Sequence, residues 1–253
     1  MRVNQFNQPI GDEVSHNYQF QFPKKEQLDG RYSSLVKLNE SHIDDLFQVL
    51  GKEDSRPSWT YLFENPILHK EEFNKYIQRL IHKEYSVFYA IIDRNQQRAL
   101  GYVSLMRINQ NHGSIEIGNV HYSNQLKRTR VATEIQFLLA QYVFEDLGYR
   151  RYEWKCDHLN EPSKKAAQRL GFTFEGVFRQ AVIYKNRNRD TAWFSMVDKE
   201  WPQIKKRYEI WLKPQNFDEK GRSLRHSCRC RRSSVCRSRR SAYEYNTQGG
   251  GGG

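Results

Sequence analysis

The sequence predicts an α+β fold, in which a mixed and mostly antiparallel sheet is flanked by helices. In the middle of the chain, runs of alternating apolar residues are separated by turn residues, which indicates a meander of antiparallel strands. Further along, a strand enters a helix through a basic turn and a second strand follows, which is typical of two parallel neighbours. Strands are predicted at 84–93, 99–109 and 113–123, and then at 150–157, 173–184 and 190–198.

The elements before the meander follow from local signals. Residues 1–29 are polar and without periodicity, so an irregular arm is expected, with the alternation at 18–22 packed on the edge of the domain. Asparagine and serine are good N-cap residues, and glycine commonly ends a helix. The predicted elements are then a strand at 31–38, a helix from Asn39 or Ser41 to Gly51, an aromatic-rich loop at 52–68 and a helix at 69–83.

The stretch from Gly113 to Gly171 organises the predicted domain. Its first strand leads through the basic turn LKRTRVATE, residues 126–134, into an apolar-periodic helix. Backbone N–H groups at such a helix start, together with cationic side chains, favour phosphate binding. Parallel pairing of the next strand brings Asn160 and Ser163 to the same end of the sheet. The stretch therefore predicts a cofactor cleft, although a solvated basic turn has the same composition.

The composition is that of one folded domain with extensions. The chain has 253 residues, and its 38% hydrophobic content is sufficient for a core. The domain is expected over residues 30–213, and the basic, low-complexity stretch 214–253 is expected to be disordered. Of the net charge of +12, the eight arginines and Glu244 from Gly221 onward contribute +7. The domain itself is therefore only mildly basic.

The basic stretch at the end of the chain carries three cysteines and a histidine that match no zinc-binding spacing, so no metal is expected. Its interleaved arginine and serine residues favour loose, salt-sensitive contact with nucleic acid or ribosome, or no role at all. The sequence shows no secretory h-region and no apolar run long enough to cross a bilayer, so a cytoplasmic protein without membrane contact is expected. The three cysteines and the histidine of the basic stretch are Cys228, Cys230, Cys236 and His226.

Four separated blocks resemble the GCN5-related N-acetyltransferases (GNAT), and most closely their ribosomal-protein-acetylating branch. They occur in the order expected for that family, and the resemblance covers about residues 30–205. It implies the GNAT-type acyl-CoA N-acyltransferase fold, with the sheet splayed between two parallel strands, and acetyl-CoA as co-substrate. The blocks are residues 126–134, 154–172, 175–179 and 187–201.

The resemblance implies how acetyl-CoA is held. The family's pyrophosphate turn reads Arg/Gln-x-x-Gly-x-Gly/Ala, and this chain has Lys127-x-x-Arg130-x-Ala132, with Arg130 in place of the usual first glycine. Arg130 can compensate with a charged contact to phosphate. A strand bulge near Asn119–Tyr122 is also implied, with a backbone N–H for the thioester oxygen. The implied binding residues are Val120, Tyr122, Lys127, Arg128, Thr129, Arg130, Val131, Ala132, Thr133, Asn160 and Ser163.

The catalytic residues implied by the resemblance are Glu116 and Ser163. Glu116 is the candidate base for the acceptor amine, with an exposed strand glutamate as the alternative. Ser163 is the candidate acid for the leaving thiolate, and Asn160 either contacts the pantetheine amides or only caps its helix. The tyrosine of many relatives is replaced by Ala167, and the carboxylate that partners the serine in others falls near Val182. Neither acid–base pair is therefore complete.

The predicted function is direct transfer of an acetyl group from acetyl-CoA to a primary amine, either a protein N-terminus or a small molecule. One alternative is a non-catalytic acyl-CoA-binding module. Another is an RNA- or ribosome-associated protein that uses its arginine-rich tail. In the last hairpin, whose turn is predicted at 185–189, Arg187, Arg189 and Asp190 can meet an acidic or carboxylate-bearing acceptor or contact only solvent.

Overall fold

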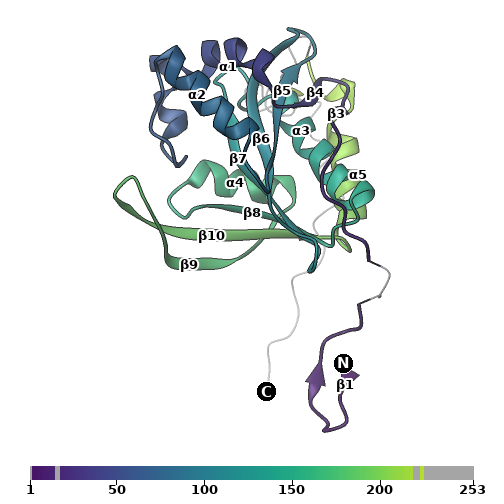
Figure 1. Ribbon diagram of the computed structural model, residues 1–253. Coiled ribbons are helices and arrows are strands. Elements are labelled where there is room, and N and C mark those ends of the chain that lie inside the picture. The colour runs from purple at the N-terminus through teal and green to yellow at the C-terminus, as the bar shows by residue number, and fades with distance from the viewer. Residues whose placement is uncertain (1, 15–17, 219–222, 225–253) are drawn as a thin grey trace, which may run out of the picture.

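The computed structural model describes residues 2–14, 18–218, 223 and 224. Within them, eight strands form one mixed sheet in the order β3-β4-β5-β6-β7-β8-β10-β9 (Figure 1). β7 and β8 are parallel, and each other neighbouring pair of this sheet is antiparallel. The strands are β3 (Gln27–Asp29), β4 (Ser33–Lys37), β5 (Val87–Asp93), β6 (Arg98–Asn109), β7 (Ser114–Tyr122), β8 (Arg151–Asp157), β9 (Thr173–Tyr184) and β10 (Arg187–Val197).

Helices cover both faces of the sheet (Figure 1). α1 and α2 pack on one face, and α3, α4 and α5 pack on the other. This arrangement confirms the predicted α+β fold with a mostly antiparallel mixed sheet. The helices are α1 (Ile43–Leu50), α2 (Lys70–Ile81), α3 (Arg130–Gln141), α4 (Glu161–Leu170) and α5 (Trp201–Trp211), with 3-10 turns η1 (Glu40–His42), η2 (Glu53–Trp59) and η4 (Pro214–Asn216) and a π-helical turn η3 (Tyr142–Asp146).

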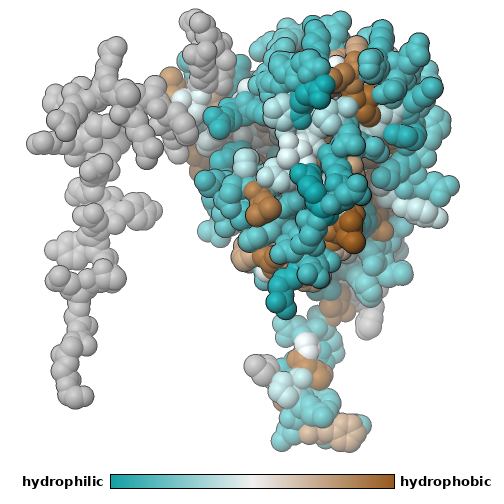
Figure 2. Space-filling model, turned by 90° about the vertical axis from the view of Figure 1, so that its left-hand side faces the viewer, coloured by the Kyte–Doolittle hydropathy of each residue, from teal (hydrophilic) through white to brown (hydrophobic). Residues whose placement is uncertain are grey.

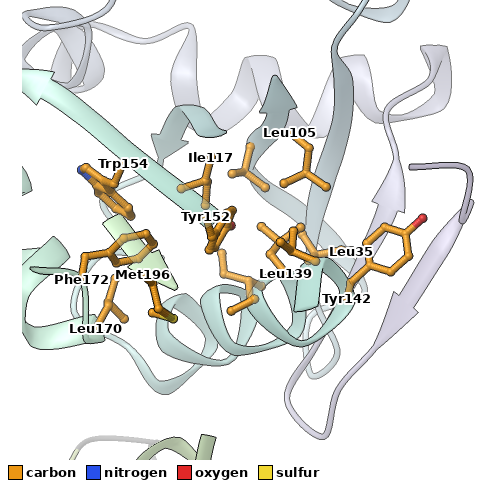
Figure 3. Packing of buried hydrophobic residues seen from close by; sticks show 14 of the residues in the cluster. Leu35, Leu105, Ile117, Leu139, Tyr142, Tyr152, Trp154, Leu170, Phe172 and Met196 are labelled. Carbon is orange, nitrogen blue, oxygen red and sulfur yellow. The ribbon is translucent and has the colours of Figure 1, made fainter. Parts of the chain in front are cut away.

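The main core lies between the sheet and α3 (Figure 3). Leu139 points from α3 towards Leu35, Leu105 and Ile117 on the strands, and all four are buried. A second cluster fills the space under α1 and α2 on the opposite face. Successive strand residues point to opposite faces, which explains why one set of strands supplies both clusters.

Glu134 joins α3 to the beginning of β4. Its side chain is buried, and its two carboxylate oxygens accept hydrogen bonds from the main-chain N–H of Arg31 (2.8 Å), the N–H of Tyr32 (2.7 Å) and the hydroxyl of Ser33 (2.7 Å). A Cβ atom on Gly30 would lie 2.5 Å from this carboxylate, so the turn needs a glycine there. The sequence alone did not indicate this contact, because the partners are about a hundred residues apart.

Two predicted connections differ from the structure. The expected loop at 52–68 contains η2, which is held in place because the indole N–H of the fully buried Trp59 donates to the carbonyl of Leu50 at 3.0 Å. The last hairpin turn is shorter than 185–189: Tyr184 pairs with Arg187, and Lys185 and Asn186 both have positive φ. Two central residues with positive φ are typical of a two-residue hairpin turn, because their twist matches that of the flanking strands. β10 therefore begins at Arg187, three residues earlier than predicted.

The ends of the domain also extend beyond the predicted limits of 30 and 213. β3 adds a strand to the sheet before residue 30, and Phe20 packs on Tyr149, which confirms the expected packing of the 18–22 alternation. α5 was not predicted, and the buried Phe217 after it packs on Tyr32. The role expected for the arginine-rich tail and its cysteines lies outside the described residues.

The face of the molecule shown in Figure 2 is largely hydrophilic, with small separate apolar patches. A hairpin of two short strands, β1 (Arg2–Val3) and β2 (Pro9–Ile10), projects from the body (Figure 1). Within the described part of the chain, no helix combines the length and apolarity that a bilayer crossing requires.

Candidate active site

β7 and β8 are paired only at their beginnings. Residues Ser114–Ile117 face Arg151–Trp154 in parallel register, but β7 continues to Tyr122 and β8 continues to Asp157 without further pairing between them. The two strands therefore part after Ile117. The predicted splaying of the two strands is confirmed, and their parted ends lead into the helices that follow them, α3 and α4.

A bulge interrupts β7 where the strands have parted. Gly118 pairs with Ser104 and His121 pairs with Tyr102, so two residues of β7, Asn119 and Val120, oppose one residue of β6. Asn119 adopts a positive φ of 48°, and its side-chain amide donates to the hydroxyl of Ser104 at 3.0 Å. The predicted irregularity in this stretch is thus confirmed. A bulge turns main-chain groups out of the regular ladder, so they can serve another partner.

The turn before α3 is shorter than predicted. Thr129 is the N-cap, its hydroxyl oxygen accepting from the N–H of Ala132 at 3.2 Å, and α3 begins at Arg130. Lys127 and Arg128 remain in the turn with exposed side chains. The next residues, 130–133, form the first helical turn instead of a loop. Main-chain N–H groups of a first turn lack intrahelical partners, which keeps this helix start suitable for an anion.

Arg130 does not point at open space beside this turn. Its guanidinium lies over the ring of Tyr32, 4.2 Å from the centroid, and 5.6 Å from that of Phe217. The hydroxyl of Thr133, one of the implied cofactor-binding residues, accepts from Arg169 on α4 at 3.3 Å, which leaves its own proton free to be donated. Sequence reasoning missed Arg169, because only the packing of α4 beside α3 brings this cation close to the helix start.

Replacing Arg130 with alanine is expected to change acetyl-CoA affinity less than threefold and to lower stability by about 1 kcal/mol, the scale of a cation–π contact. Calorimetric titration with acetyl-CoA and urea unfolding of the same variant give the two values. The control for stability is Lys127→Ala, because Lys127 lies in the turn just before α3 and does not stack on Tyr32. A tenfold loss of affinity in Arg130→Ala would show instead that the guanidinium leaves Tyr32 to bind phosphate.

Asn160 and Ser163 lie at the start of α4, next to the gap. Asn160 caps the helix, with its side-chain oxygen accepting from the N–H of Ser163 at 3.2 Å. The hydroxyl of Ser163 accepts from the indole N–H of the buried Trp154 at 3.0 Å. Because an indole N–H can only donate, this bond leaves the proton of the serine hydroxyl available to another acceptor. The capping role of Asn160 is confirmed, and its contact with pantetheine stays a prediction.

Glu116 lies on the opposite face of the sheet from Ser163 and is buried, so the exposed-strand interpretation is wrong. Its Oε2 lies 2.8 Å from Lys155 Nζ and 2.8 Å from Arg107 Nη1. Lys155 also contacts Glu153 Oε2 at 2.7 Å and lies over the ring of Trp193. Within the described residues, Oε1 accepts no hydrogen bond.

The free oxygen of Glu116 is the one nearest the gap. It lies 3.8 Å from the point that a Cβ atom on Gly118 would occupy, and Gly118 is the first residue of β7 beyond the parallel pairing. Two cations on Oε2 fix the carboxylate and leave Oε1 as a hydrogen-bond acceptor for an incoming amine. Sequence reasoning missed these two cations, Arg107 and Lys155, since they come from other strands.

Other reactive groups near the gap are held in structural roles. His121 is buried, with Nε2 2.8 Å from the hydroxyl of Ser58 and Nδ1 3.1 Å from that of Tyr102, and burial lowers its pKa to about 3. The hydroxyl of Tyr122 accepts from Gln136 at 2.6 Å. Burial raises the pKa of the Cys156 thiol, which disfavours a thiolate nucleophile. Among the described residues, no group of three histidine, cysteine, aspartate or glutamate side chains is placed to hold a metal ion.

Comparisons with known proteins agree with this geometry. The family model described as an acetyltransferase (GNAT) domain matches residues 34–173, more than half of the chain. A crystal structure of a GCN5-related N-acetyltransferase from Brucella melitensis is 44% identical, with a TM-score of 0.80 over 83% of this chain and 96% of that one.

Two curated relatives are more distant. An uncharacterized N-acetyltransferase of Bacillus licheniformis is 29% identical over 45% of this chain and 63% of its own length. A protein of Bacillus subtilis, provisionally named a ribosomal N-acetyltransferase, is 27% identical over 40% of this chain and 55% of its own length. Less than two thirds of each of these relatives is matched. The family model and the fold nevertheless agree along the domain, and the chain belongs to the GNAT family of acetyltransferases.

Proposed function

We propose that this protein transfers an acetyl group from acetyl-CoA directly to a primary amine. The observation that carries the proposal is the gap between β7 and β8, because it joins the two faces of the sheet at one place. Ser163 lies on the face of α3 and α4, and Glu116 lies on the other face. A thioester held in the gap would therefore have a hydrogen-bond donor on its sulfur side and a carboxylate on the side of the amine.

The residues around the gap fit acetyl-CoA. The turn at Lys127–Thr129 and the first N–H groups of α3 would hold the pyrophosphate. Asn160 would face the pantetheine arm, and main-chain N–H groups of the bulged segment at Val120 and Tyr122 would face the thioester oxygen. Acetyl-CoA supplies the activated acyl group when bound, and this chain supplies its position.

The chemistry proposed for the chain's own residues is general base catalysis followed by stabilisation of the leaving group. Glu116 Oε1 takes a proton from the acceptor ammonium, and the neutral amine attacks the thioester carbon. The C–N bond forms as the C–S bond breaks, and the hydroxyl of Ser163 donates a hydrogen bond to the departing sulfur. The amine gives up its second proton to solvent, and the thiolate takes up a proton from solvent and leaves as coenzyme A.

The acceptor is proposed to be a protein N-terminal amine or a small-molecule amine. The provisional name of the Bacillus subtilis relative supports the first, since it describes a ribosomal acetyltransferase. The backbone around the gap does not distinguish an α-amine from an alkyl amine. The side chains that do so are expected on the face of Glu116, where the acceptor enters.

Two measurements on the full chain test the proposal. Calorimetric titration is expected to show acetyl-CoA binding with one site per chain, and a thiol-release assay is expected to show acceptor-dependent formation of free coenzyme A. The control is coenzyme A itself, which should bind but release no further thiol. Binding without thiol release for any amine would favour a non-catalytic module, and absence of binding would remove the proposal.

A further inference from the structure

Arg189 is a buried arginine on the face of the sheet that carries Glu116. Its side chain belongs to β10 and is 8% exposed. Nε donates to the hydroxyl of Thr191 at 3.2 Å, and the guanidinium lies 5.6 Å from the ring centroid of Phe63 and 5.8 Å from that of Tyr184. Within the described residues, Arg189 forms no ion pair, and its two Nη groups donate no hydrogen bond.

Within the described residues, the carboxylate of Asp157 on the neighbouring strand β8 forms no ion pair with Arg189. Its Oδ2 accepts from the hydroxyl of Tyr184 at 2.7 Å, and its Oδ1 accepts from the N–H of Leu159 at 2.9 Å. Burial, followed by this bond to Asp157, raises the pKa of Tyr184 to about 12, so the tyrosine remains a donor. A buried guanidinium is unfavourable unless an anion pairs with it, and two free Nη groups are the geometry that binds a carboxylate.

Two cations close to the turn of the hairpin are used differently. Lys185 Nζ donates to the carbonyl of Trp59 at 2.7 Å, and Arg187 Nη2 donates to the carbonyl of Thr60 at 2.9 Å. Both bonds tie the hairpin to the end of η2, and neither supplies a negative charge to Arg189. The hairpin thus holds Arg189 beside the rings of Phe63 and Tyr184, without an anionic partner among the described residues.

The position of Arg189 along the sheet relates it to the gap. In the parallel register, Ile117 faces Trp154, so the bulge that follows on β7 is level with Asp157. Asp157 pairs with Thr191 on β10, and Arg189 is the next residue on the same face. Adjacent same-face positions are about 7 Å apart, which places Arg189 one step beyond the level of the proposed thioester.

We infer that Arg189 binds a carboxylate of the acceptor, so that the substrate is an amine with its own carboxylate close to the reacting nitrogen. Free α-amino acids have this chemistry, and so do peptides with an acidic residue next to the N-terminus. The inference rests on the proposed function, since it concerns the acceptor of the same reaction. It makes Arg189 a specificity-determining residue on the side of Glu116.

The test compares matched acceptors with the full chain at saturating acetyl-CoA. Each α-amino acid is paired with its amide, and each dipeptide with aspartate in second place is paired with its asparagine counterpart. For one pair of each kind, kcat/KM is measured for both members and expressed as a ratio. Comparing this ratio between enzymes removes the different basicity of the two amines.

In Arg189→Gln, the ratio is expected to fall roughly tenfold or more, the scale of one lost charge-assisted contact. Arg189→Lys should retain part of the preference, and the exposed Arg179→Gln on β9 is the matched control with an unchanged ratio. The thermal midpoint and acetyl-CoA affinity of Arg189→Gln should match the wild type. A fall in the ratio for the amino-acid pair indicates a free amino acid as the acceptor, and a fall for the dipeptide pair indicates an acidic peptide.

Two outcomes would overturn the inference while leaving the proposed function intact. In one, Arg189→Gln lowers kcat/KM equally for both members of every pair, which is the signature of a structural role. In the other, the wild type acetylates only amines without a carboxylate. Failure of the wild type to bind acetyl-CoA is a separate result, because it removes the proposed function and the inference with it.

Discussion

Replacing Glu116 with glutamine is expected to lower kcat by roughly 100-fold or more, the lower end of what a positioned general base contributes. Glutamine has nearly the same shape and can still accept hydrogen bonds from Arg107 and Lys155, but its amide cannot take a proton from an ammonium. Steady-state thiol release at saturating acetyl-CoA measures the effect. Acetyl-CoA affinity should stay within threefold, because Glu116 lies on the opposite face from the proposed cofactor site.

The matched control for this prediction is Glu153→Gln. Glu153 also contacts Lys155, at 2.7 Å, and it pairs with Glu116 across the two parallel strands, but its other oxygen is held by Arg151 at 2.6 Å, so neither oxygen is free. Its substitution perturbs the same ion cluster without removing the carboxylate next to Gly118. Activity within threefold of wild type is expected. If both variants lose activity equally, the cluster acts through its structure and Glu116 is not the base.

Glu134→Ala is expected to lower the free energy of unfolding by roughly 3 kcal/mol. The substitution leaves the N–H groups of Arg31 and Tyr32 and the hydroxyl of Ser33 without their acceptor, and unsatisfied buried groups cost about 1–3 kcal/mol each before water enters. Equilibrium urea unfolding followed by tryptophan fluorescence gives the value. The loss should appear as a lower urea concentration at the unfolding midpoint, with little change in how steeply the unfolding free energy depends on urea concentration.

The control for stability is Glu209→Ala, since Glu209 is an exposed carboxylate on the neighbouring helix α5. Its effect should remain within about 0.5 kcal/mol, as for most exposed substitutions. A loss below 1 kcal/mol in Glu134→Ala would contradict the prediction. It would mean that the desolvation of the carboxylate offsets most of what its three hydrogen bonds contribute.

Local signals were sufficient wherever neighbours in the chain determine the conformation. Asn160 caps α4 because its side chain reaches an N–H only three residues away, and Gly171 ends that helix with a φ of 104°, which glycine adopts readily. The same signals failed at α5, whose apolar residues Trp201, Ile204 and Tyr208 have helical spacing that was not recognised. They also failed in the last hairpin, where the two positive φ angles were not apparent from composition.

The sequence alone determined the antiparallel meander, the helix caps and four motif blocks in order, and these blocks indicated the family, which implies the parting of β7 from β8. Tertiary structure alone decided where the charged side chains ended. Arg130 stacks on Tyr32, Glu116 is buried beside Lys155, and Arg189 lies beside the rings of Phe63 and Tyr184. The physical reason is that backbone conformation depends on near neighbours, whereas the partner of a long charged side chain comes from a distant strand.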